Sequence, residues 1–404
     1  MKTRRPGILL AAVAAATVLP GHFAAAQRGN DQPVVKDVVR SRWAARPKWS
    51  PDGQWIVYDD KDSSNDFRIY RIRPDGTGKE CLTCDRKETP RNAGAANFDR
   101  SGRFLLFSAE KSKHFPVLGK QIVGPGAGTF NDVFVMESQT RAIYRLTNVA
   151  SGIRAGGSLY PKFSHDGSRI AWCDLQGKGE ARNRFGQWRI AVAPFLASPQ
   201  PQLGKIQYYN SAEQGLSFCE MQAWTNDDSG LIFAGAPLPG QDGYTSDVCR
   251  LDLSTGRITR LTETSGLNGE PAEFEEHAAI SSADRLAYMS SKPHGVDFNS
   301  NFLLWLKSDL WIANADGSEA RQVTFYNVPG HPEYDGRRVM VSEMGWSPDG
   351  RQLVARVFFV ASGAAEKSRR QPLGRWRRNP QGQQQETTAE DEGVSVIRIF
   401  QFSR

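Results

Sequence analysis

The 404-residue chain has only five cysteines and, beyond its N-terminus, no long apolar run. No later stretch approaches the roughly 18 apolar residues that a membrane-spanning helix needs. The sequence also contains no G-x-S-x-G, H-E-x-x-H or P-loop motif, so the usual signatures of serine hydrolases, zinc peptidases and nucleotide-binding enzymes are missing. The composition, 39% hydrophobic and 24% charged, is nevertheless that of a folded globular protein.

The small number of cysteines limits the covalent chemistry of the chain. The five are Cys81, Cys84, Cys173, Cys219 and Cys249, and an odd number leaves at least one thiol unpaired. Cys81 and Cys84 form a C-x-x-C, but an aspartate follows where a c-type haem site needs histidine. No second C-x-x-C completes a zinc site. We interpret the pair as a local disulfide or as two cysteines at a strand end.

The N-terminus has the three parts of a secretory signal peptide. Basic residues come first, an apolar stretch over 8–19 follows, and an A-x-A-like cleavage site lies at 24–26. The apolar stretch is too short to span a bilayer. We therefore expect residues 1–26 to be removed and residues 27–404 to form a single domain. The mature protein should be periplasmic or secreted, with no transmembrane segment.

The net charge of +7 is unevenly distributed along the chain. Without the signal peptide, 48 Lys and Arg remain against 44 Asp and Glu, a net charge of +4. Residues 366–378 contribute +5 and residues 386–392 contribute −4, so the rest of the chain is close to neutral. We therefore do not expect a nucleic-acid partner. Because these charge blocks flank a glutamine cluster, we expect residues 361–393 to form a disordered loop.

Six segments of the mature chain share one pattern. Each has an apolar anchor, a turn rich in Pro, Asp, Ser or Gly, and then a β-rich run, which predicts a hairpin. A second β-rich element follows most of these hairpins and ends in a short apolar-Thr run. Two hairpins supply the four strands of one propeller blade. The anchors are Trp49, Phe98, Phe163, Trp224, Ile280 and Trp346.

Two of the hairpin segments, Trp49-Ser-Pro-Asp-Gly53 and Trp346-Ser-Pro-Asp-Gly350, resemble the TolB-like or PD40 repeat. The resemblance covers nearly all of residues 40–402. It implies an all-β fold, a six-bladed β-propeller built from four-stranded antiparallel blades. The chain looks most similar to uncharacterised exported members of this family, so the resemblance implies no particular activity.

The last blade needs a strand from elsewhere. After Trp346 and its hairpin, only the run 394–402 remains to supply a third strand. We expect residues 33–39, near the mature N-terminus, to supply the fourth. The ring would then close with both chain ends in one blade, which removes an exposed sheet edge.

Four of the second β-rich elements begin with an aspartate, which invites a calcium interpretation. Because the aspartates recur in blades that are far apart, we interpret them instead as structural acceptors of backbone N–H bonds at a turn. They are Asp66, Asp132, Asp247 and Asp309. The Gly-rich segment 124–128 precedes a strand and not a helix, so we interpret it as a loop.

The anchors are 49 to 66 residues apart, more than the about 40–45 residues of a compact blade. In antiparallel blades, the connections between the second and third strands and those between blades lie on one face. Insertions confined to one face usually mark the binding face of a repeat protein. The insertions are 109–130, 174–187, 235–245, 290–307 and 361–393, with 263–276 and 327–341 between blades.

The inner strands should begin on this long-loop face, with their first residues in or beside the central channel. These residues are Arg46, Tyr160, Glu220, Glu276, His277 and Glu343. Carboxylates and an imidazole that converge there can ligate a divalent cation, form acid–base pairs, or simply be hydrated. The candidate metal cluster is Glu220, Glu276, His277 and Glu343. Of the other mature histidines, His114, His294 and His331 fall on rim loops and His165 in an opposite-face turn.

Two functions fit this pattern. The first is an exported binding module, monomeric, that holds an envelope protein, a cell-wall component or a carbohydrate on the long-loop face. For this function we assign no catalytic or cofactor-binding residue. The alternative is a metal-assisted carbohydrate lyase or hydrolase at the channel mouth. The exported oligogalacturonate lyases, which are PD40 relatives, are similar in using histidines and a metal at this place.

Overall fold

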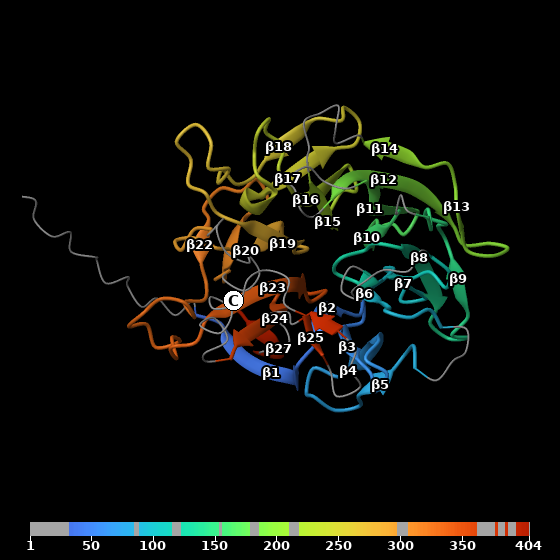
Figure 1. The fold of residues 1–404 in the computed structure, drawn as a ribbon, viewed down its shortest axis with the longest axis horizontal. Coiled ribbons are helices and arrows are strands. Elements are labelled where there is room, and N and C mark those ends of the chain that lie inside the picture. The colour runs from blue at the N-terminus through green and yellow to red at the C-terminus, as the bar shows by residue number, and fades with distance from the viewer. Residues whose placement is uncertain are drawn as a thin grey trace, which may run out of the picture.

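Six antiparallel sheets are arranged around a common axis, and the innermost strand of each lies nearest that axis (Figure 1). The computed structural model describes residues 32–84, 89–114, 123–152, 156–177, 186–209, 218–296, 306–361, 376–378, 384–386 and 393–403. The predicted signal peptide and most of the 361–393 insertion lie outside these residues. Within them, no helix is long and apolar enough to cross a membrane.

In blades 1, 2, 4 and 5 the strands pair in chain order from the inside outwards, as do the first four strands of blade 3; blade 6 takes its outermost strand from the N-terminal region. Blade 1 contains β2 (Ala45–Trp49), β3 (Ile56–Lys61), β4 (Phe67–Ile72) and β5 (Glu80–Cys81). Blade 2 contains β6 (Gly94–Phe98), β7 (Phe104–Glu110), β8 (Asn131–Glu137) and β9 (Ile143–Arg145). Blade 3 contains β10 (Ser158–Phe163), β11 (Arg169–Gly177) and β12 (Gln187–Leu196), with β13 (Gln202–Leu203) and β14 (Gln207–Tyr209) both paired to β12.

The second half of the ring repeats the arrangement. Blade 4 contains β15 (Cys219–Trp224), β16 (Gly230–Gly235), β17 (Asp247–Asp252) and β18 (Ile258–Arg260). Blade 5 contains β19 (Glu275–Ile280), β20 (Arg285–Ser290), β21 (Asp309–Asn314) and β22 (Arg321–Gln322). Blade 6 contains β23 (Val339–Trp346), β24 (Gln352–Val360), β27 (Gly393–Gln401) and β1 (Val34–Ser41). The predicted all-β six-bladed propeller is confirmed, with one extra short strand in blade 3.

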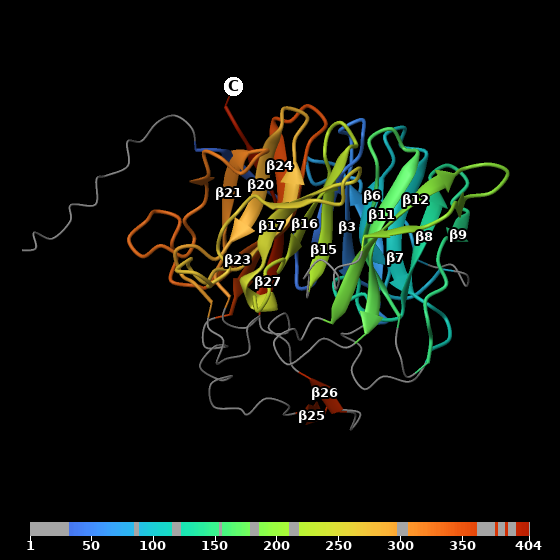
Figure 2. The ribbon, with the colours of Figure 1, turned by 90° about the horizontal axis from the view of Figure 1, so that it is seen from above.

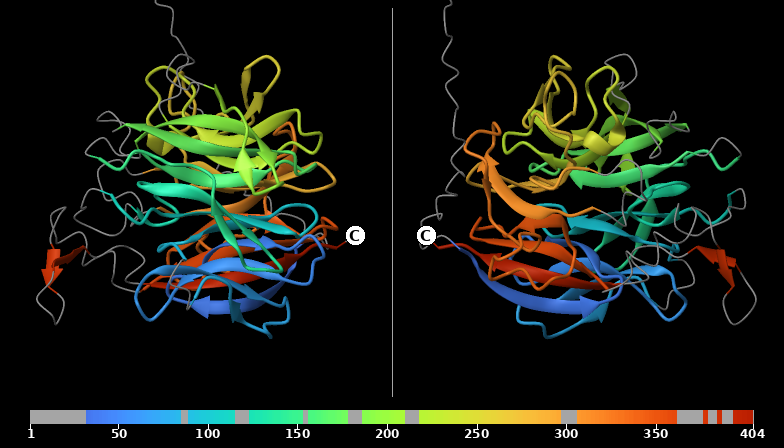
Figure 3. Two further views of the ribbon diagram at one scale, coloured as in Figure 1. Left: turned by 90° about the vertical axis from the view of Figure 1, so that its right-hand side faces the viewer. Right: turned by 60° about the vertical axis from the view of Figure 1, so that its left-hand side comes forward.

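Blade 6 closes the ring as predicted. Strand β1 from the N-terminal region pairs antiparallel with β27 from the C-terminal end, from Val34 opposite Gln401 to Ser41 opposite Ser395. The two strands lie side by side in both views of Figure 3. Because the first and last described segments share one blade, the sheet has no open gap at the junction of the chain ends.

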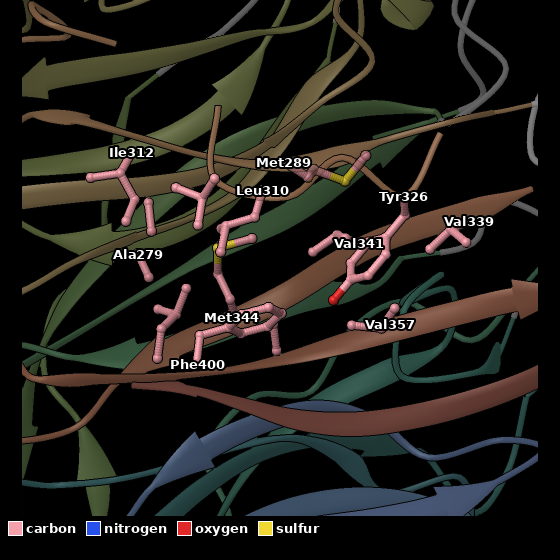
Figure 4. Close-up of a cluster of buried hydrophobic side chains, with 14 of the residues drawn as sticks. Ala279, Met289, Leu310, Ile312, Tyr326, Val339, Val341, Met344, Val357 and Phe400 are labelled. Atoms are coloured by element: carbon pink, nitrogen blue, oxygen red, sulfur yellow. The ribbon is translucent and has the colours of Figure 1, made fainter. Parts of the chain in front are cut away.

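Apolar clusters fill the spaces between neighbouring blades. The largest lies between blades 5 and 6, where Leu310 and Met289 of one blade meet Val341 and Phe400 of the other (Figure 4). Further clusters join blades 1 and 2, 2 and 3, 3 and 4, 4 and 5, and 6 and 1. Each blade therefore buries both of its faces, as the nearly continuous apolar runs of the second strands require.

Two of the anchor tryptophans donate a hydrogen bond to the neighbouring blade. The indole Nε1 of Trp224 in blade 4 donates a hydrogen bond of 3.2 Å to the carbonyl of Lys162 in blade 3. Trp346 in blade 6 makes the same bond, also 3.2 Å, to Ala279 in blade 5. In the turn after Trp346, Gly350 has φ of 66°, a left-handed conformation that favours glycine.

Three of the four strand-start aspartates accept the backbone N–H bond predicted for them. Asp132 accepts a backbone bond from Val149 (2.8 Å) and Asp309 accepts one from Tyr326 (2.9 Å). Asp247 accepts one from Thr264 (2.9 Å). The fourth, Asp66, forms an ion pair with Arg91 (2.9 Å).

The structure decides between a local disulfide and a pair of free cysteines for the C-x-x-C segment. Cys81 and Cys84 form the local disulfide, at the outer edge of blade 1. Cys173, Cys219 and Cys249 are free and fully buried in the cluster between blades 3 and 4. The Sγ atoms of Cys173 and Cys219 lie 3.7 Å apart.

The long and short connections divide between the two faces as predicted. Viewed edge-on, the strands of all blades run between these faces (Figure 2). The turns between first and second strands are tight, for example 50–55 and 347–351, whereas 111–130 and 291–308 connect second to third strands. Within the insertion predicted to be disordered, β25 (Trp376–Arg378) and β26 (Gln384–Glu386) pair as a short antiparallel hairpin; the rest of that prediction falls outside the described residues.

Candidate functional site

Every inner strand has an irregularity near its long-loop end. The pairing register between first and second strands shifts in all six blades, as at a β-bulge. In five blades the irregularity includes a non-glycine residue with positive φ, a conformation that is uncommon for such residues. These are Arg46 (52°), Ala95 (55°), Tyr160 (49°), His277 (54°) and Glu343 (26°). The bulges re-aim these positions relative to a regular strand.

The polar side chains at this level form two groups, the first of which joins blades 6 and 1. In this arginine group, the Nε of Arg46 donates to Asp59 (2.9 Å) and its Nη1 donates to Glu343 (3.3 Å). Arg356 lies 3.6 Å from the other oxygen of Glu343, which also accepts a bond from Ser342 (2.9 Å). All five residues are buried. Each carboxylate of the group therefore has an arginine partner.

The second group joins blades 4 and 5. Glu220, Glu276 and His277 place ligand atoms within 4.8 Å of one another. The imidazole lies between the two carboxyls, with Nδ1 3.4 Å from Glu220 and Nε2 3.2 Å from Glu276. Gln222 donates to Glu220 at 2.8 Å. In the described part of the chain, neither Glu220 nor Glu276 has an arginine or lysine within ion-pair distance.

The two groups differ in protonation because their neighbours differ. Burial raises the pKa of Glu343, but the charges of Arg356 and Arg46 outweigh burial and lower it to about 2. Burial raises the pKa of Glu220 to about 7, against the hydrogen bond from Gln222. Burial, followed by the charge of Glu220, raises the pKa of Glu276 well above its usual value.

The remaining member of the second group is also uncharged at neutral pH. Burial lowers the pKa of His277 to about 4. A neutral imidazole and a protonated Glu276 carboxyl, which donates a hydrogen bond to Glu220, leave this group with at most one negative charge. In the described part of the chain, the carboxylate–histidine group thus contains acceptors without an arginine or lysine within ion-pair distance.

Two lysines lie next to these groups on the inner strands of blades 1 and 3. Lys48 donates to the carbonyl of Met344, and burial lowers its pKa to about 8. Lys162 lies with its Nζ 5.5 Å from the centre of the Tyr160 ring. Burial, followed by the charge of Lys48, lowers the pKa of Lys162 well below its usual value.

Blade 2 contributes no charged side chain at this level. Its inner strand has glycine and alanine there, and a Cβ added to Gly94 would lie 2.7 Å from Pro125. A Cβ on Gly126 would lie 2.8 Å from Nη1 of Arg46. The Gly-rich segment 124–128 of the same blade therefore occupies the space that a larger side chain from β6 would take.

The structure brings together three of the four residues in the predicted metal cluster. Glu220, Glu276 and His277 are grouped, whereas Glu343 lies with Arg46 and Arg356. The other predicted rim histidines lie elsewhere. His114 contacts Glu110 (2.8 Å), and His331 stacks on Phe325; His294 follows β20, and His165 contacts Asp228 on the opposite face.

Several residues of the site were not identified from the sequence. Asp59 and Arg356 lie on second strands, β3 and β24, which the anchor-based count did not examine. Lys48, Lys162 and Gln222 each lie two residues beyond an inner-strand residue that was identified, so the period of two in strands was an available signal. The bulges hid that signal, because they change which face a residue occupies.

A separate surface hollow lies on the short-turn face between blades 4 and 5. It has a volume of about 620 Å³ and is lined by Asn226, Asp227, Asp284 and Arg250 among others. The carboxylates in it are already engaged, since Asp227 accepts from Ser229 (2.8 Å) and Asp284 accepts from Asn226 (2.7 Å). The first bond is local to a tight turn and the second joins the turns of two blades, so both are structural and the hollow is a weaker candidate site than the channel groups.

Comparison of the sequence with known proteins finds a distant relative. No family model matches the chain. Dipeptidyl-peptidase 5 of Porphyromonas gingivalis is 23% identical over 255 residues, which cover 62% of this chain and 30% of the peptidase. The chain therefore matches less than a third of the length of that relative.

Solved structures with similar folds include TolB and enzymes. TolB from Acinetobacter baumannii has 19% identity and a TM-score of 0.44, covering 70% of this chain and 53% of TolB. A luciferin-regenerating enzyme has 10% identity and a TM-score of 0.50, covering 91% of this chain and 97% of the enzyme. At these identities the likeness concerns the fold alone. The pairing of its strands establishes the chain as a six-bladed β-propeller.

Proposed function

We propose that this protein is an exported binding module that holds a protein, cell-wall or carbohydrate ligand over the channel on the long-loop face. The observation that carries the proposal is convergence. Five blades each direct a polar side chain to the same end of the ring, namely Arg46, Tyr160, Glu220, His277 and Glu343. Sites assembled from several elements of a rigid scaffold are typical of ligand-binding proteins.

The backbone at this level supports the same proposal. Non-glycine residues in left-handed conformations are retained at the cost of strain, and they cluster at ligand-binding and catalytic sites. Four of the five positive-φ residues on the inner strands carry polar side chains. Three of them belong to the channel groups, and the fourth, Tyr160, lies beside His277. A purely structural ring closure would not require that Arg46, Tyr160, His277 and Glu343 all occupy such positions.

Export and monomeric assembly are parts of this proposal. The three-part N-terminus over 1–26 supports export to a periplasm or beyond. N-terminal sequencing of the protein recovered from the culture of an expressing bacterium tests this directly. A mature chain that begins at Gln27 is the expected result, and a chain that retains Met1 would contradict export.

Binding can be tested on a panel of oligosaccharides and on purified peptidoglycan. The double variant Glu276→Gln/His277→Asn should weaken binding of any retained ligand at least about 10-fold, since it removes two central polar contacts. The matched control is His165→Ala on the opposite face, which should bind like the wild type. If His165→Ala reduces binding and the double variant does not, the ligand lies on the wrong face for this proposal.

A metal-assisted carbohydrate lyase or hydrolase is the second candidate. The observation that favours it is the position of the His277 imidazole between the Glu220 and Glu276 carboxyls, which is an arrangement suited to proton transfer. Release of new reducing ends or of unsaturated sugars from a polysaccharide panel would support this activity. Binding to the same panel without product formation would favour the module.

A further inference from the structure

We propose that Glu220, Glu276 and His277 form a seat for one divalent transition-metal ion, with Glu343 outside the coordination sphere. The proposal concerns ion binding by the chain itself and does not rest on the ligand of the proposed module. It starts from a difference between the two channel groups. In the arginine group every carboxylate forms an ion pair with an arginine, whereas in the described residues no carboxyl of the carboxylate–histidine group has an arginine or lysine within ion-pair distance. The charge of Lys162 reaches Glu220 only from beyond that distance.

The geometry of the three side chains suits an ion. All three ligand atoms lie within 4.8 Å of one another. A four-coordinate ion with bonds of about 2.0–2.2 Å separates its ligands by roughly 3.3–3.6 Å. Closing the group around an ion therefore needs shifts on the order of 1 Å, within the reach of side-chain torsions.

The surroundings of Glu276 lack a positive partner within ion-pair distance among the described residues. Its side chain is 9% exposed, and the contacts found for it there are the hydrogen bond to Glu220 and the approach of His277. A buried carboxyl normally finds an arginine, a lysine or several N–H donors. The two contacts of His277 are also longer than good hydrogen bonds, at 3.4 and 3.2 Å, so the imidazole is not fully engaged either.

The backbone holds the third ligand in place. His277 has φ of 54°, and the register of β19 against β20 shifts between Glu276 and Ala279. In a regular strand, adjacent residues point to opposite faces. The bulge instead lets Glu276 and His277, which are consecutive, both approach Glu220 from the next blade. The group is thus built by two blades that are rigidly packed against each other.

The donor set indicates the class of ion. Two carboxylate oxygens and one imidazole nitrogen suit Zn²⁺ or Mn²⁺, and three protein ligands leave at least one position open for water or a ligand. Calcium requires six to eight oxygen ligands and rarely takes imidazole. We therefore assign the seat to a transition-metal ion.

The test is titration of the full chain, stripped with a chelator, with ZnCl2 or MnCl2 alone. Isothermal titration calorimetry should report one ion per chain for the wild type. Glu276→Gln keeps the shape and polarity of the side chain and should weaken binding at least about 10-fold, because even outer-shell changes often have that effect. No binding by the wild type, or binding of Ca²⁺ in preference to both ions, would overturn the assignment.

A matched control lies one residue away. Glu275 is as buried as Glu276 and accepts a bond from Ser290 (2.9 Å), but it is not a member of the group. Glu275→Gln should therefore bind the ion like the wild type. Equal weakening in Glu275→Gln and Glu276→Gln would show a general loss of structure and refute the seat.

A second variant covers the case in which Glu276→Gln does not fold. His277→Asn removes the imidazole, while asparagine tolerates the left-handed conformation at this position. With Co²⁺ as a spectroscopic ion, the wild type should show an absorption spectrum typical of nitrogen coordination. An unchanged spectrum in folded His277→Asn would exclude His277 as a ligand.

Discussion

The two halves of the channel are built from the same repeat but differ in their charge balance. In blades 6 and 1, Arg46 and Arg356 neutralise Asp59 and Glu343. In blades 4 and 5, the corresponding strands bring two glutamates to one imidazole, and among the described residues no arginine or lysine lies within ion-pair distance of them. The repeat therefore determines where polar side chains converge. The individual residues determine whether the buried carboxylates there are neutralised by arginines of the chain itself or leave room for a bound ion.

The largest effect should come from breaking the arginine group. Arg46→Met leaves Asp59 and Glu343 without their shared partner, and removal of one partner from a buried ion pair typically costs about 3–5 kcal/mol. Urea unfolding followed by tryptophan fluorescence would measure the loss. The control is Arg103→Met, whose exposed contact with Glu137 should matter little. Equal losses of unfolding free energy in the two variants would show that the buried arginine group contributes no more to stability than an exposed ion pair.

The second-largest effect should be the pH dependence of the free energy of unfolding that arises from Glu343 in the arginine group. The pKa of Glu343 is lowered in the folded state to about 2, so its contribution to stability is present above its unfolded pKa of about 4.5. That contribution, on the order of 3 kcal/mol, is lost as the pH falls from about 5 through 2. The wild type should therefore lose more stability over this range than Glu343→Gln. Parallel pH profiles would contradict the role of Glu343.

The smallest effect on folding should come from Glu276→Gln in chelated protein. Glu276 has a raised pKa, so keeping it protonated in the fold opposes stability above the unfolded pKa, and glutamine mimics the protonated form. Near pH 7 the variant should be as stable as the wild type or more stable, with no loss beyond about 1 kcal/mol. Thermal melts at pH 7 would measure this. A loss as large as that of Arg46→Met would mean that the two groups are equivalent.

Much of the fold could be predicted because its signals are local. Trp49 and Trp346 begin the same turn pattern, and the turn glycines and aspartates recur wherever a hairpin is needed. The missing fourth strand of blade 6 was also predictable, since counting strands left one vacancy and residues 33–39 were the unused β-rich run. The structural role of Asp132, Asp247 and Asp309 followed from their recurrence.

The site was predictable only in part. Counting back from the anchors located Glu220, Glu276 and His277, because inner strands begin at one face in every blade. The same count placed Glu343 with them. It could not foresee the two arginines that bind Glu343, since Arg356 lies on a second strand and Arg46 was counted without its partners. Ion-pair partners are set by packing between strands and blades, which a strand-by-strand pattern does not contain.

By itself, the sequence determined that this chain forms six four-stranded blades, closes through its N-terminal segment and carries its long loops on one face. These properties depend on turn chemistry and on strand periodicity, which act over a few residues. Only the tertiary structure decided which channel side chains neutralise one another and which do not. The physical reason is that electrostatic pairing depends on distances of a few ångströms between residues hundreds of positions apart, such as Arg46 and Glu343 at 3.3 Å.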